Sequence, residues 1–324
     1  MKAVIPAAGI GKRLRPFTLT RPKVLLPVAG KPIIGHILDR VIDSGIDDVT
    51  LIIGYMGEKV IEYVEQNYEV RLRFIEQKDR RGLGHAVGMG LEESDEEVLV
   101  ILGDTILDLD FKEFTRAKHS VIGVMTVDDP HRFGIVEHRE GWITRLVEKP
   151  KEPASNLAIA GIYLLKSQLR LKKAIEYIVE HNITTKGEYQ LTDALQVLLD
   201  RGEQMRIENI TACYDCGTRD TLLMTNRHLL KSVEQDFRRY DSSIIIPPVS
   251  IHPSVEIDRS IVGPDVSVGE NSVIRNSIIE DSIVDNNTVI EDLIIKNCLF
   301  GYKSTVKGTC CTSDIGDYSS HKLC

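Results

Sequence analysis

The sequence predicts an α/β protein: a mostly parallel sheet with helices on both faces, followed by a parallel β-helix. Two observations predict this architecture. Over the first 210 residues, short apolar runs alternate with amphipathic segments of helical period, as in sheets joined by crossover helices. After residue 240, apolar residues instead recur every five or six positions among Gly, Asn, Asp and Ser. That short period favours coils of about three strands, stacked into a β-helix.

The elements of the first part are predicted in chain order from their periodicity. Helices are expected over residues 33–44, where Gly45 ends the apolar pattern, and over residues 57–66. A long amphipathic helix is expected over residues 219–239, as a connector to the second part. Strands are expected at residues 3–5, 49–53, 72–75, 98–102, 121–127, 135–138, 159–165 and 205–208.

The change of pattern divides the chain into three parts. Residues 1–240 are predicted to form the sheet domain, with the connecting helix at its end. Residues 241–302 are predicted to form a β-helix of about three coils. Residues 303–324, which contain three of the six cysteines, lose the repeat and are expected to be loose or to act as a cap.

Composition restricts the class of protein. A net charge of −8 argues against nucleic acid or an anionic membrane as the main partner. The sequence contains no run of 18 apolar residues and begins directly with a strand pattern, so we expect a cytoplasmic protein without a membrane span. Cys213 and Cys216 have the spacing of half a zinc site, but no second pair stands near them. We therefore expect buried or half-buried thiols.

A Gly-rich turn follows the first predicted strand. Gly9 and Gly11 stand just after that strand, and Arg13 and Lys23 follow shortly afterwards. Backbone N–H groups at such a turn can approach a polyphosphate, and nearby cations neutralise its charge. The spacing is not that of the P-loop, and Leu14 occupies the place of the third glycine of the dinucleotide fingerprint. The turn therefore predicts a polyphosphate site of another type.

Two aspartates stand where they could hold a cation. Asp104 comes just after the apolar run 98–102, and Asp215 comes just before the helix expected from residue 219. Carboxylates suit Mg²⁺, although an Asp at either place can equally cap a helix or a turn. Both interpretations stay open for each residue alone. Together, beside a polyphosphate turn, the two favour a site for Mg²⁺ and a triphosphate.

The N-terminal run resembles the signature of the sugar-1-phosphate nucleotidyltransferases, GGxGxRLxPxT…PKxLxPV…KP. The chain carries AGIGKRLRPFT at residues 8–18, PKVLLPV at 22–28 and KP at 31–32. Ala8 replaces the first glycine and is small enough to keep the backbone approach open. The resemblance covers about residues 1–225. It implies a Rossmann-like first domain, and in that family a left-handed β-helix is a frequent C-terminal extension.

For the nucleotide, the resemblance implies a base-reading loop and a metal site. Gln77 and the backbone of Gly82 would read uracil or thymine, since an amide offers both a donor and an acceptor. Without that loop, Gln77 would be interpreted as a solvated surface amide. Asp104 and Asp215 would hold Mg²⁺. The other nucleotide-binding residues that the resemblance implies are Ala7, Ala8, Gly9, Gly11 and Arg13.

For the sugar phosphate, the resemblance implies a pocket built from later motifs, including EKP at residues 148–150 and GEYQLTD at 187–193. Glu148 and Glu188 would accept hydrogen bonds from hexose hydroxyls, and Lys149 would bind the phosphate. The other residues matched to this pocket are Gly134, Gly161 and Tyr163.

The implied reaction joins a pyrimidine nucleoside triphosphate to a hexose 1-phosphate and releases pyrophosphate. The chain is most similar to the thymidylyl- and uridylyltransferase members, so dTTP is favoured over UTP, with glucose 1-phosphate as the sugar. The substrate phosphate is the nucleophile, and the sequence shows no protein nucleophile motif. Arg13 would bind the leaving pyrophosphate, Lys23 the α-phosphate region and Lys149 the incoming phosphate.

Two other functions stay open. A bifunctional enzyme would also transfer acetyl groups in its β-helix, and His252 is the one histidine of the repeat that could serve as base. A non-catalytic scaffold would be expected to lose the phosphate and metal residues, which this chain keeps. The expected partners are therefore the nucleoside triphosphate and the sugar 1-phosphate. A homo-oligomer is also expected, because the strand edges of a β-helix must be covered.

Overall fold

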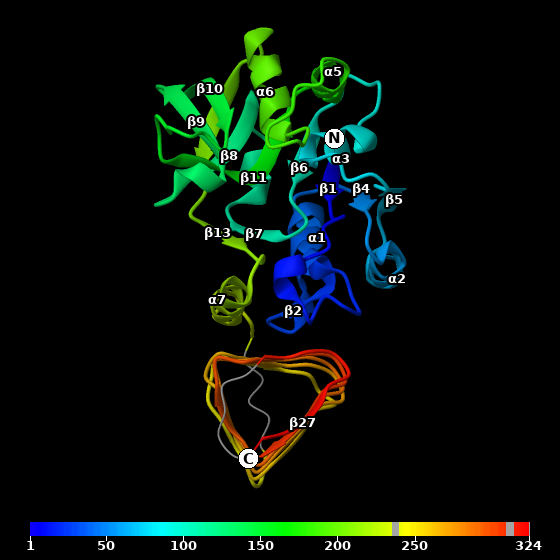
Figure 1. The fold of residues 1–324 in the computed structure, drawn as a ribbon, viewed down its shortest axis with the longest axis vertical. Coiled ribbons are helices and arrows are strands. Elements are labelled where there is room, and N and C mark those ends of the chain that lie inside the picture. Colours follow the sequence, from blue (N-terminus) through cyan, green and yellow to red (C-terminus); the bar gives the residue numbers. More distant parts are fainter. Residues whose placement is uncertain (235–239, 309–313, 324) are drawn as a thin grey trace. The chain divides into compact units, whose positions relative to one another are not determined.

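The computed structural model describes residues 1–234, 240–308 and 314–323 (Figure 1). The chain forms two compact units. The first contains residues 1–9 and 37–213, and the second contains residues 10–36 and the chain from residue 214 onward. The division therefore does not follow the linear boundary at residue 240, because residues 10–36 and the connecting helix share a unit with the β-helix. We describe each unit by itself.

The first unit is built on a nine-stranded sheet in the order β5-β4-β1-β6-β11-β8-β12-β10-β9. The first four strands in this order, β5, β4, β1 and β6, are parallel to one another, and β8 is parallel to β12. Strand β11 runs antiparallel to both neighbours, and β10 and β9 form an antiparallel edge. The predicted α/β class is confirmed. The strands are β1 (Lys2–Pro6), β4 (Asp48–Ile53), β5 (Arg71–Glu76), β6 (Val98–Ile101), β8 (Ser120–Thr126), β9 (Gly134–Arg139), β10 (Trp142–Glu148), β11 (Leu157–Leu165) and β12 (Met205–Asn209).

The hydrophobic core of this unit lies between its apolar strands and its helices. Strands β1 and β6 are apolar and buried throughout most of their length, which suits strands covered on both faces. One buried cluster joins this sheet to helices α3, α5 and α6, with Val87, Ile175 and Leu195 among its members. The helices are α2 (Gly57–Asn67), α3 (Leu83–Gly90), α4 (Phe111–Thr115), α5 (Gln168–Glu180) and α6 (Leu191–Asp200); α1 (Ile33–Asp43) and β13 (Ala212–Asp215) pass from one unit to the other. The remaining short elements are β7 (Thr105–Asp108) and the 3-10 turn η3 (Pro130–Arg132).

The second unit contains a left-handed parallel β-helix, which Figure 1 shows as a triangle seen along its axis. One side stacks four strands and each of the other two stacks five, which is more than the roughly three coils predicted. The first side contains β14 (Ile244–Ile245), β17 (Ile261–Val262), β20 (Ile278–Glu280) and β23 (Ile294–Lys296); the second β15 (Val249–Ile251), β18 (Val266–Val268), β21 (Ile283–Val284), β24 (Leu299–Phe300) and β26 (Asp314–Ile315); the third β16 (Glu256–Asp258), β19 (Val273–Arg275), β22 (Val289–Glu291), β25 (Thr305–Gly308) and β27 (Ser320–Leu323).

The polar residues between the β-helix strands have a structural reason. Many corners use left-handed backbone, which Asn and Asp adopt more readily than other non-glycine residues. Apolar residues point inward at matching rungs, such as Val262 and Ile279, and form a buried core. The corner residues with positive φ include Asp265, Asn271, Asn276, Asp281, Asn287, Asp292 and Asn297.

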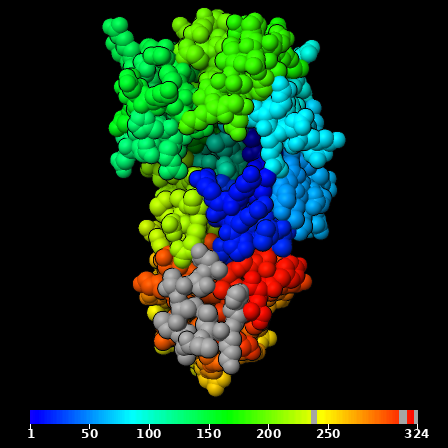
Figure 2. All heavy atoms as spheres, viewed as in Figure 1, coloured from blue at the N-terminus to red at the C-terminus, as the bar shows by residue number. Residues whose placement is uncertain are grey.

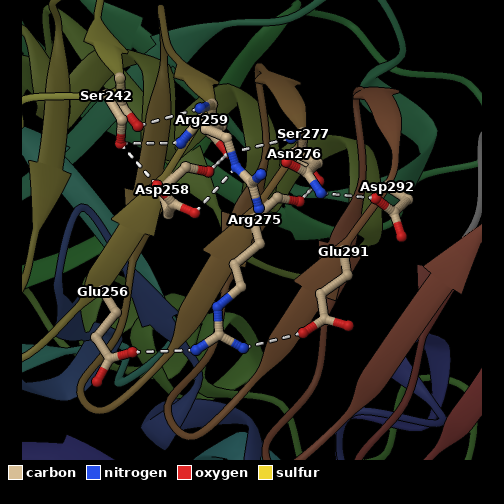
Figure 3. Close-up of polar contacts among 11 residues, drawn as sticks. Ser242, Glu256, Asp258, Arg259, Arg275, Asn276, Ser277, Glu291 and Asp292 are labelled. Carbon is tan, nitrogen blue, oxygen red and sulfur yellow. Dashed lines mark hydrogen bonds and ion pairs between the residues drawn. The ribbon is translucent and has the colours of Figure 1, made fainter.

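The β-helix sides differ in what they present outward. On the third side, Arg275 lies between Glu256 and Glu291 and pairs with both, at 3.3 and 3.1 Å (Figure 3). On the first side, Ile244, Ile261, Ile278 and Ile294 are in register on successive strands. Ile244 and Ile294 are more than half exposed, at 59% and 57%. The first side therefore carries an apolar row beside one ion pair, between Lys296 and Glu280 at 2.8 Å.

Two expectations for the C-terminal half were wrong. The connecting helix α7 covers Arg219–Leu230, because the next three backbone N–H groups bond to carbonyls three residues back and the helix ends there; the end of the predicted helix at 235–239 lies outside the described residues. The tail is not loose in its described part, since β25, β26 and β27 continue the stack. Figure 2 shows these last residues, in red, lying against the preceding coils. Among the described residues, no helix is long and apolar enough to cross a membrane.

Candidate active site

The Gly-rich turn belongs to the second unit from residue 10 onward, and Lys23 supports it. Gly11 adopts a left-handed conformation with φ of 68°, and a Cβ there would lie 2.9 Å from the Lys23 Cβ. Thr18 Oγ1 donates to the Gly11 carbonyl at 2.8 Å. The segment continues through the 3-10 turns η1 (Lys12–Leu14) and η2 (Lys23–Leu25) and the short strands β2 (Pro27–Val28) and β3 (Lys31–Pro32). Glycine is therefore required at position 11 by both conformation and space.

Cations and a carboxylate converge near Gly217. The Lys23 Nζ lies 3.5 Å from Asp215 Oδ1, and the Lys23 side chain is only 7% exposed. A Cβ at Gly217 would lie 2.7 Å from Asp215 Oδ2 and 2.8 Å from Arg13 Nη2. The missing side chain at Gly217 thus leaves room for both charged groups. The structure brings Arg13 and Lys23 together with Asp215, which is far from both in sequence.

The β-helix and α7 make polar contacts with residues 10–36, the segment that follows the Gly-rich turn. Arg21 Nη1 pairs with Asp285 Oδ2 at 2.9 Å, and Thr20 Oγ1 donates to Asp317. Burial raises the pKa of the Asp285 carboxyl, while the Arg21 guanidinium opposes that rise. The buried Asn226 side chain of α7 accepts from Ala29 N at 2.8 Å and from Ser267 Oγ at 2.9 Å. The predicted phosphate segment and the β-helix therefore form one packed structure.

In the first unit, the predicted residues gather at the carboxyl ends of parallel strands. Ala7 N donates to Ile52 O at 2.7 Å, at the end of β4, and Gly103 N donates to Pro6 O at 3.1 Å. Ala7 and Ala8 are buried, so they offer backbone rather than side chain. Asp104, in the loop after β6, accepts from Thr105 Oγ1 at 3.4 Å. Strand ends of this kind are where α/β sheets bind ligands.

The predicted base loop packs against the loop that carries Glu188 and is hydrogen-bonded to it. Gly82 has φ of 115°, and a Cβ there would lie 2.5 Å from Tyr189 O. Tyr189 N donates to Arg81 O, and Gly84 N donates to Tyr189 O, both at 2.8 Å. The Arg81 guanidinium also stacks over the Tyr189 ring, 4.9 Å from its centre. Gln77 is buried at the end of β5 and faces this loop.

The predicted sugar-phosphate residues Glu148 and Lys149 form a connected pair. Lys149 Nζ lies 2.8 Å from Glu148 Oε1, and Thr192 Oγ1 donates to Glu148 Oε2 at 2.7 Å. A Cβ at Gly134 would lie 2.7 Å from Thr192 Oγ1, so glycine leaves room for this contact. Asp193 lies next to the pair, and burial raises the pKa of its carboxyl. Polar groups of β10 and α6 thus meet at one place.

The remaining predicted sugar residues fall into different surroundings. Glu188 is exposed and accepts from Gln190 Nε2 at 3.0 Å. The Gly161 carbonyl accepts from Leu102 N at 3.0 Å inside the sheet. Tyr163 is 3% exposed and belongs to the hydrophobic core, where burial raises the pKa of its hydroxyl and Glu148 adds to the rise. The structure therefore places Tyr163 among the packed residues of the core.

The two carboxylates predicted to hold a metal belong to different units. In the described part of the chain, no group of three or more His, Cys, Asp or Glu side chains is arranged to hold a metal ion. Mg²⁺ is commonly bound by one or two carboxylates together with substrate phosphates and water. Asp104 in the first unit and Asp215 in the second each offer the carboxylate oxygens that this mode of binding uses.

Several residues of these clusters were not predicted. Thr192 and Asp193 stand inside the GEYQLTD motif. Their interactions with the Glu148 and Lys149 pair, a hydrogen bond for Thr192 and an electrostatic effect for Asp193, join segments that are distant in sequence. No role was predicted for Tyr189 or Arg81. Gly217 follows Asp215 closely in the sequence, which was a usable signal. Of the cysteines, Cys216 and Cys298 are buried and Cys213 is half-buried, as expected; Cys310, Cys311 and Cys324 lie outside the described residues.

The chain is similar to known nucleotidyl transferases. A family profile described as nucleotidyl transferase matches residues 2–232. The bifunctional protein GlmU of Methanocaldococcus jannaschii is 37% identical over 248 residues, which are 76% of this chain and 59% of that protein. The UTP–glucose-1-phosphate uridylyltransferase AglF of Haloferax volcanii is 31% identical over 211 residues, which are 62% of this chain and 85% of that protein. The chain therefore spans less than two thirds of the length of the bifunctional relative.

Two solved structures share the fold. A Bacillus anthracis protein described as a glucose-1-phosphate thymidylyltransferase, in complex with a sucrose, has a TM-score of 0.61 and 31% identity, covering 73% of this chain and 97% of its own. A UDP-glucose pyrophosphorylase complexed with UDP-glucose also has a TM-score of 0.61, with 24% identity, and covers 72% of this chain and 99% of its own. The second likeness concerns the fold alone.

Proposed function

The chain belongs to the nucleotidyl transferase family, and we propose that it joins a pyrimidine nucleoside triphosphate to a hexose 1-phosphate, releasing pyrophosphate. The favoured substrates are dTTP, with UTP close behind, and glucose 1-phosphate. The observation that carries the proposal is the convergence of Arg13, Lys23 and Asp215 beside the Gly-rich turn. Such a cluster is suited to a polyphosphate and its cation.

The proposed chemistry is a direct displacement. An oxygen of the sugar phosphate attacks the α-phosphorus of the nucleotide, the bond to the β-phosphate oxygen breaks, and pyrophosphate leaves. The protein then needs to align two anions and neutralise the charge that develops. Arg13 binds the leaving pyrophosphate, Lys23 the α-phosphate region and Lys149 the incoming phosphate. The 7% exposure of Lys23 supports a fixed position for its charge.

A divalent cation fits this scheme through oxygen donors. Asp104 and Asp215 would hold Mg²⁺, which would supply positive charge to neutralise the nucleotide phosphates. The Asp215 side chain is half exposed, at 48%, so one of its oxygens can reach a ligand while Lys23 stays close to the other.

Base and sugar are proposed to be read by separate groups. Gln77 and the Gly82 backbone would read the base, and Glu148, Lys149 and Glu188 would bind the sugar phosphate. The close approach of Gly82 to the Tyr189 backbone, together with the hydrogen bonds that Tyr189 makes on either side of Gly82, supports a loop of fixed geometry. Glu148 is held from two sides, by Lys149 and Thr192, which supports a role in orienting hydroxyl groups.

A pyrophosphate-release screen tests this proposal. Five nucleoside triphosphates are combined with four hexose 1-phosphates in the presence of Mg²⁺, and the NDP-sugar is identified by mass. The expected result is release that requires both substrates and is fastest with dTTP or UTP. Preference for ATP or GTP over both pyrimidine nucleotides would contradict the assignment of the base loop.

A second activity in the β-helix is the alternative, and the bifunctional name of the GlmU relatives favours it. An acetyl transferase needs a general base. In this chain the exposed His252 has its Nδ1 2.8 Å from Ser254 Oγ, which leaves Nε2 as the nitrogen available to a substrate. Incubation with acetyl-CoA and an amino sugar phosphate decides the point, since acetylated product would establish the second activity.

We also propose that the β-helix assembles the protein into a homo-oligomer. The support is the outward row of Ile244, Ile261, Ile278 and Ile294 on its first side. An apolar row on an otherwise polar surface is typical of contact sites. Ile278→Lys should lower the mass measured by light scattering without unfolding the chain; an unchanged oligomer would place the interface elsewhere.

A further inference from the structure

The side chain of Gln77 is held by two neighbours in the first unit. Gln77 lies at the end of β5, where its backbone N–H donates to Ile53 O at 2.8 Å, and its side chain is 6% exposed. The amide nitrogen Nε2 lies 3.4 Å from the Gly82 carbonyl oxygen and 3.3 Å from His85 Nδ1. His85 stands in the first turn of α3.

These contacts fix which end of the amide faces which way. A carbonyl oxygen only accepts hydrogen bonds, so the Gly82 carbonyl requires the NH₂ group of Gln77 on its side. The same NH₂ group then faces His85, whose Nδ1 accepts when the proton is on Nε2. Both amide hydrogens are thereby engaged, and Oε1 is left as the group that can accept a hydrogen bond from a base.

We propose that His85 is a positioning residue, which holds the Gln77 amide with Oε1 toward the base and so favours uracil or thymine over cytosine. This inference rests on the proposed function and on Gln77 as its base reader. Uracil and thymine present an N3–H donor, whereas cytosine presents a bare N3 acceptor. A fixed Oε1 pairs with the former and opposes the latter. Without His85, the amide can rotate and accommodate either pattern.

The charges around His85 favour its neutral form. Burial lowers the pKa of the imidazole, the Arg81 guanidinium lowers it further, and Asp79 opposes them. His85 also borders a cavity of about 350 Å³ between α3 and α5, where Lys172, Glu176 and Glu180 contribute further charges. When the pH falls through the lowered pKa, Nδ1 gains a proton and can no longer accept. Base discrimination should therefore be full above that pKa and fall below it.

Substitutions at His85 separate this role from a structural one. His85→Leu removes the acceptor. His85→Asn keeps one, because its Oδ1 lies close to the place of Nδ1. At pH 8, we expect His85→Leu to lower the ratio of kcat/KM for UTP to that for CTP by about tenfold or more. The KM for the sugar 1-phosphate should stay within about twofold, and His85→Asn should restore most of the ratio.

A double variant distinguishes failure of this inference from failure of the proposed function. In a Gln77→Ala background, His85→Leu should have no further effect on the UTP-to-CTP ratio. An equal effect with and without Gln77, or equal losses with UTP and CTP, would overturn the positioning role. If Gln77→Ala alone leaves the ratio unchanged, base reading by Gln77 is wrong and the inference falls with it. Should His85→Leu fail to fold, His85→Ala takes its place, with the same expected loss of the ratio and the same contradicting results.

Discussion

Replacing Thr192 by Val tests whether Glu148 and Lys149 bind the sugar phosphate. Thr192 is buried at 5% exposure, and its hydroxyl donates to Glu148 Oε2 at 2.7 Å. Valine has nearly the same shape but no hydroxyl, so the substitution removes this hydrogen bond and little else. Glu148 keeps its ion pair with Lys149. The carboxylate therefore loses one of the two contacts that orient it.

The expected magnitude follows from the type of contact. A hydrogen bond to a charged group contributes about 1.5–3 kcal/mol net. Because Lys149 still restrains Glu148, we expect the lower end, about 1.5 kcal/mol, to appear in sugar-phosphate binding. That corresponds to roughly a tenfold rise in Kd. The nucleotide should bind as before, since the base loop does not include this contact.

Isothermal titration and steady-state kinetics measure this directly. The Kd and KM for the hexose 1-phosphate should rise about tenfold in Thr192→Val, with the KM for the nucleotide within twofold. Thr192→Ser, which keeps the hydroxyl, serves as the control and should remain close to wild type. A Thr192→Val protein with unchanged sugar-phosphate affinity, or with equal losses for both substrates, would refute the reasoning.

Four further substitutions probe the phosphate site and its support. Arg13→Ala should lower kcat about 10²–10³-fold, the scale for one preorganised electrostatic group, with a much smaller change in KM; retention of a tenth of the turnover would contradict its role. Asp104→Asn and Asp215→Asn should each raise the Mg²⁺ concentration needed for half-maximal rate and nearly abolish turnover while the circular dichroism spectrum is kept; unchanged Mg²⁺ dependence in both would exclude the two-carboxylate site. Asn226→Ala leaves Ala29 N and Ser267 Oγ buried without their acceptor and should lower the free energy of unfolding by about 2–4 kcal/mol in urea titrations; a loss below about 0.5 kcal/mol would show that this contact does not hold the segment.

Asn226 lies on α7 and contacts both the 10–36 segment and the β-helix. Arg21, in the same segment, makes a second link to the β-helix through Asp285. Lys23 stands two residues after Arg21 in the chain. The β-helix therefore supports the phosphate segment in addition to its proposed role in assembly. A chain cut after Tyr240 should lose stability in residues 10–36, and with it much of its turnover.

Much of the fold was predictable because strands and coils follow local patterns. The eight predicted strands correspond to strands of the sheet, since buried apolar runs bounded by turns have few other structures available. The β-helix followed from its period and its Asn and Asp corners. The end of α7 was not predictable from its apolar pattern, which continues past Leu230. The tail was misjudged because Tyr318 and its neighbours lack the apolar repeat, yet their backbone pairs with the preceding coil.

The site was predictable only in part, for a physical reason. Charged residues beside a Gly-rich turn indicate a phosphate site from sequence alone, and Arg13, Lys23 and Asp215 do converge. Contacts across the fold leave no local pattern. The hydrogen bond from Thr192 to Glu148, for example, joins two motifs that are 44 residues apart. The motif of Tyr163 suggested a ligand contact, and the structure places its side chain in the core, which the local sequence pattern does not indicate.

Exchange of labelled pyrophosphate into dTTP or UTP tests the proposed direct displacement. If the sugar phosphate itself attacks the nucleotide, labelled pyrophosphate enters the triphosphate only when the NDP-sugar is present, because bond formation reverses only through that product. The same preparation should release pyrophosphate only when both the nucleotide and the hexose 1-phosphate are supplied. Exchange from dTTP or UTP alone, with no sugar compound present, would reveal a covalent nucleotidyl-enzyme and contradict the account.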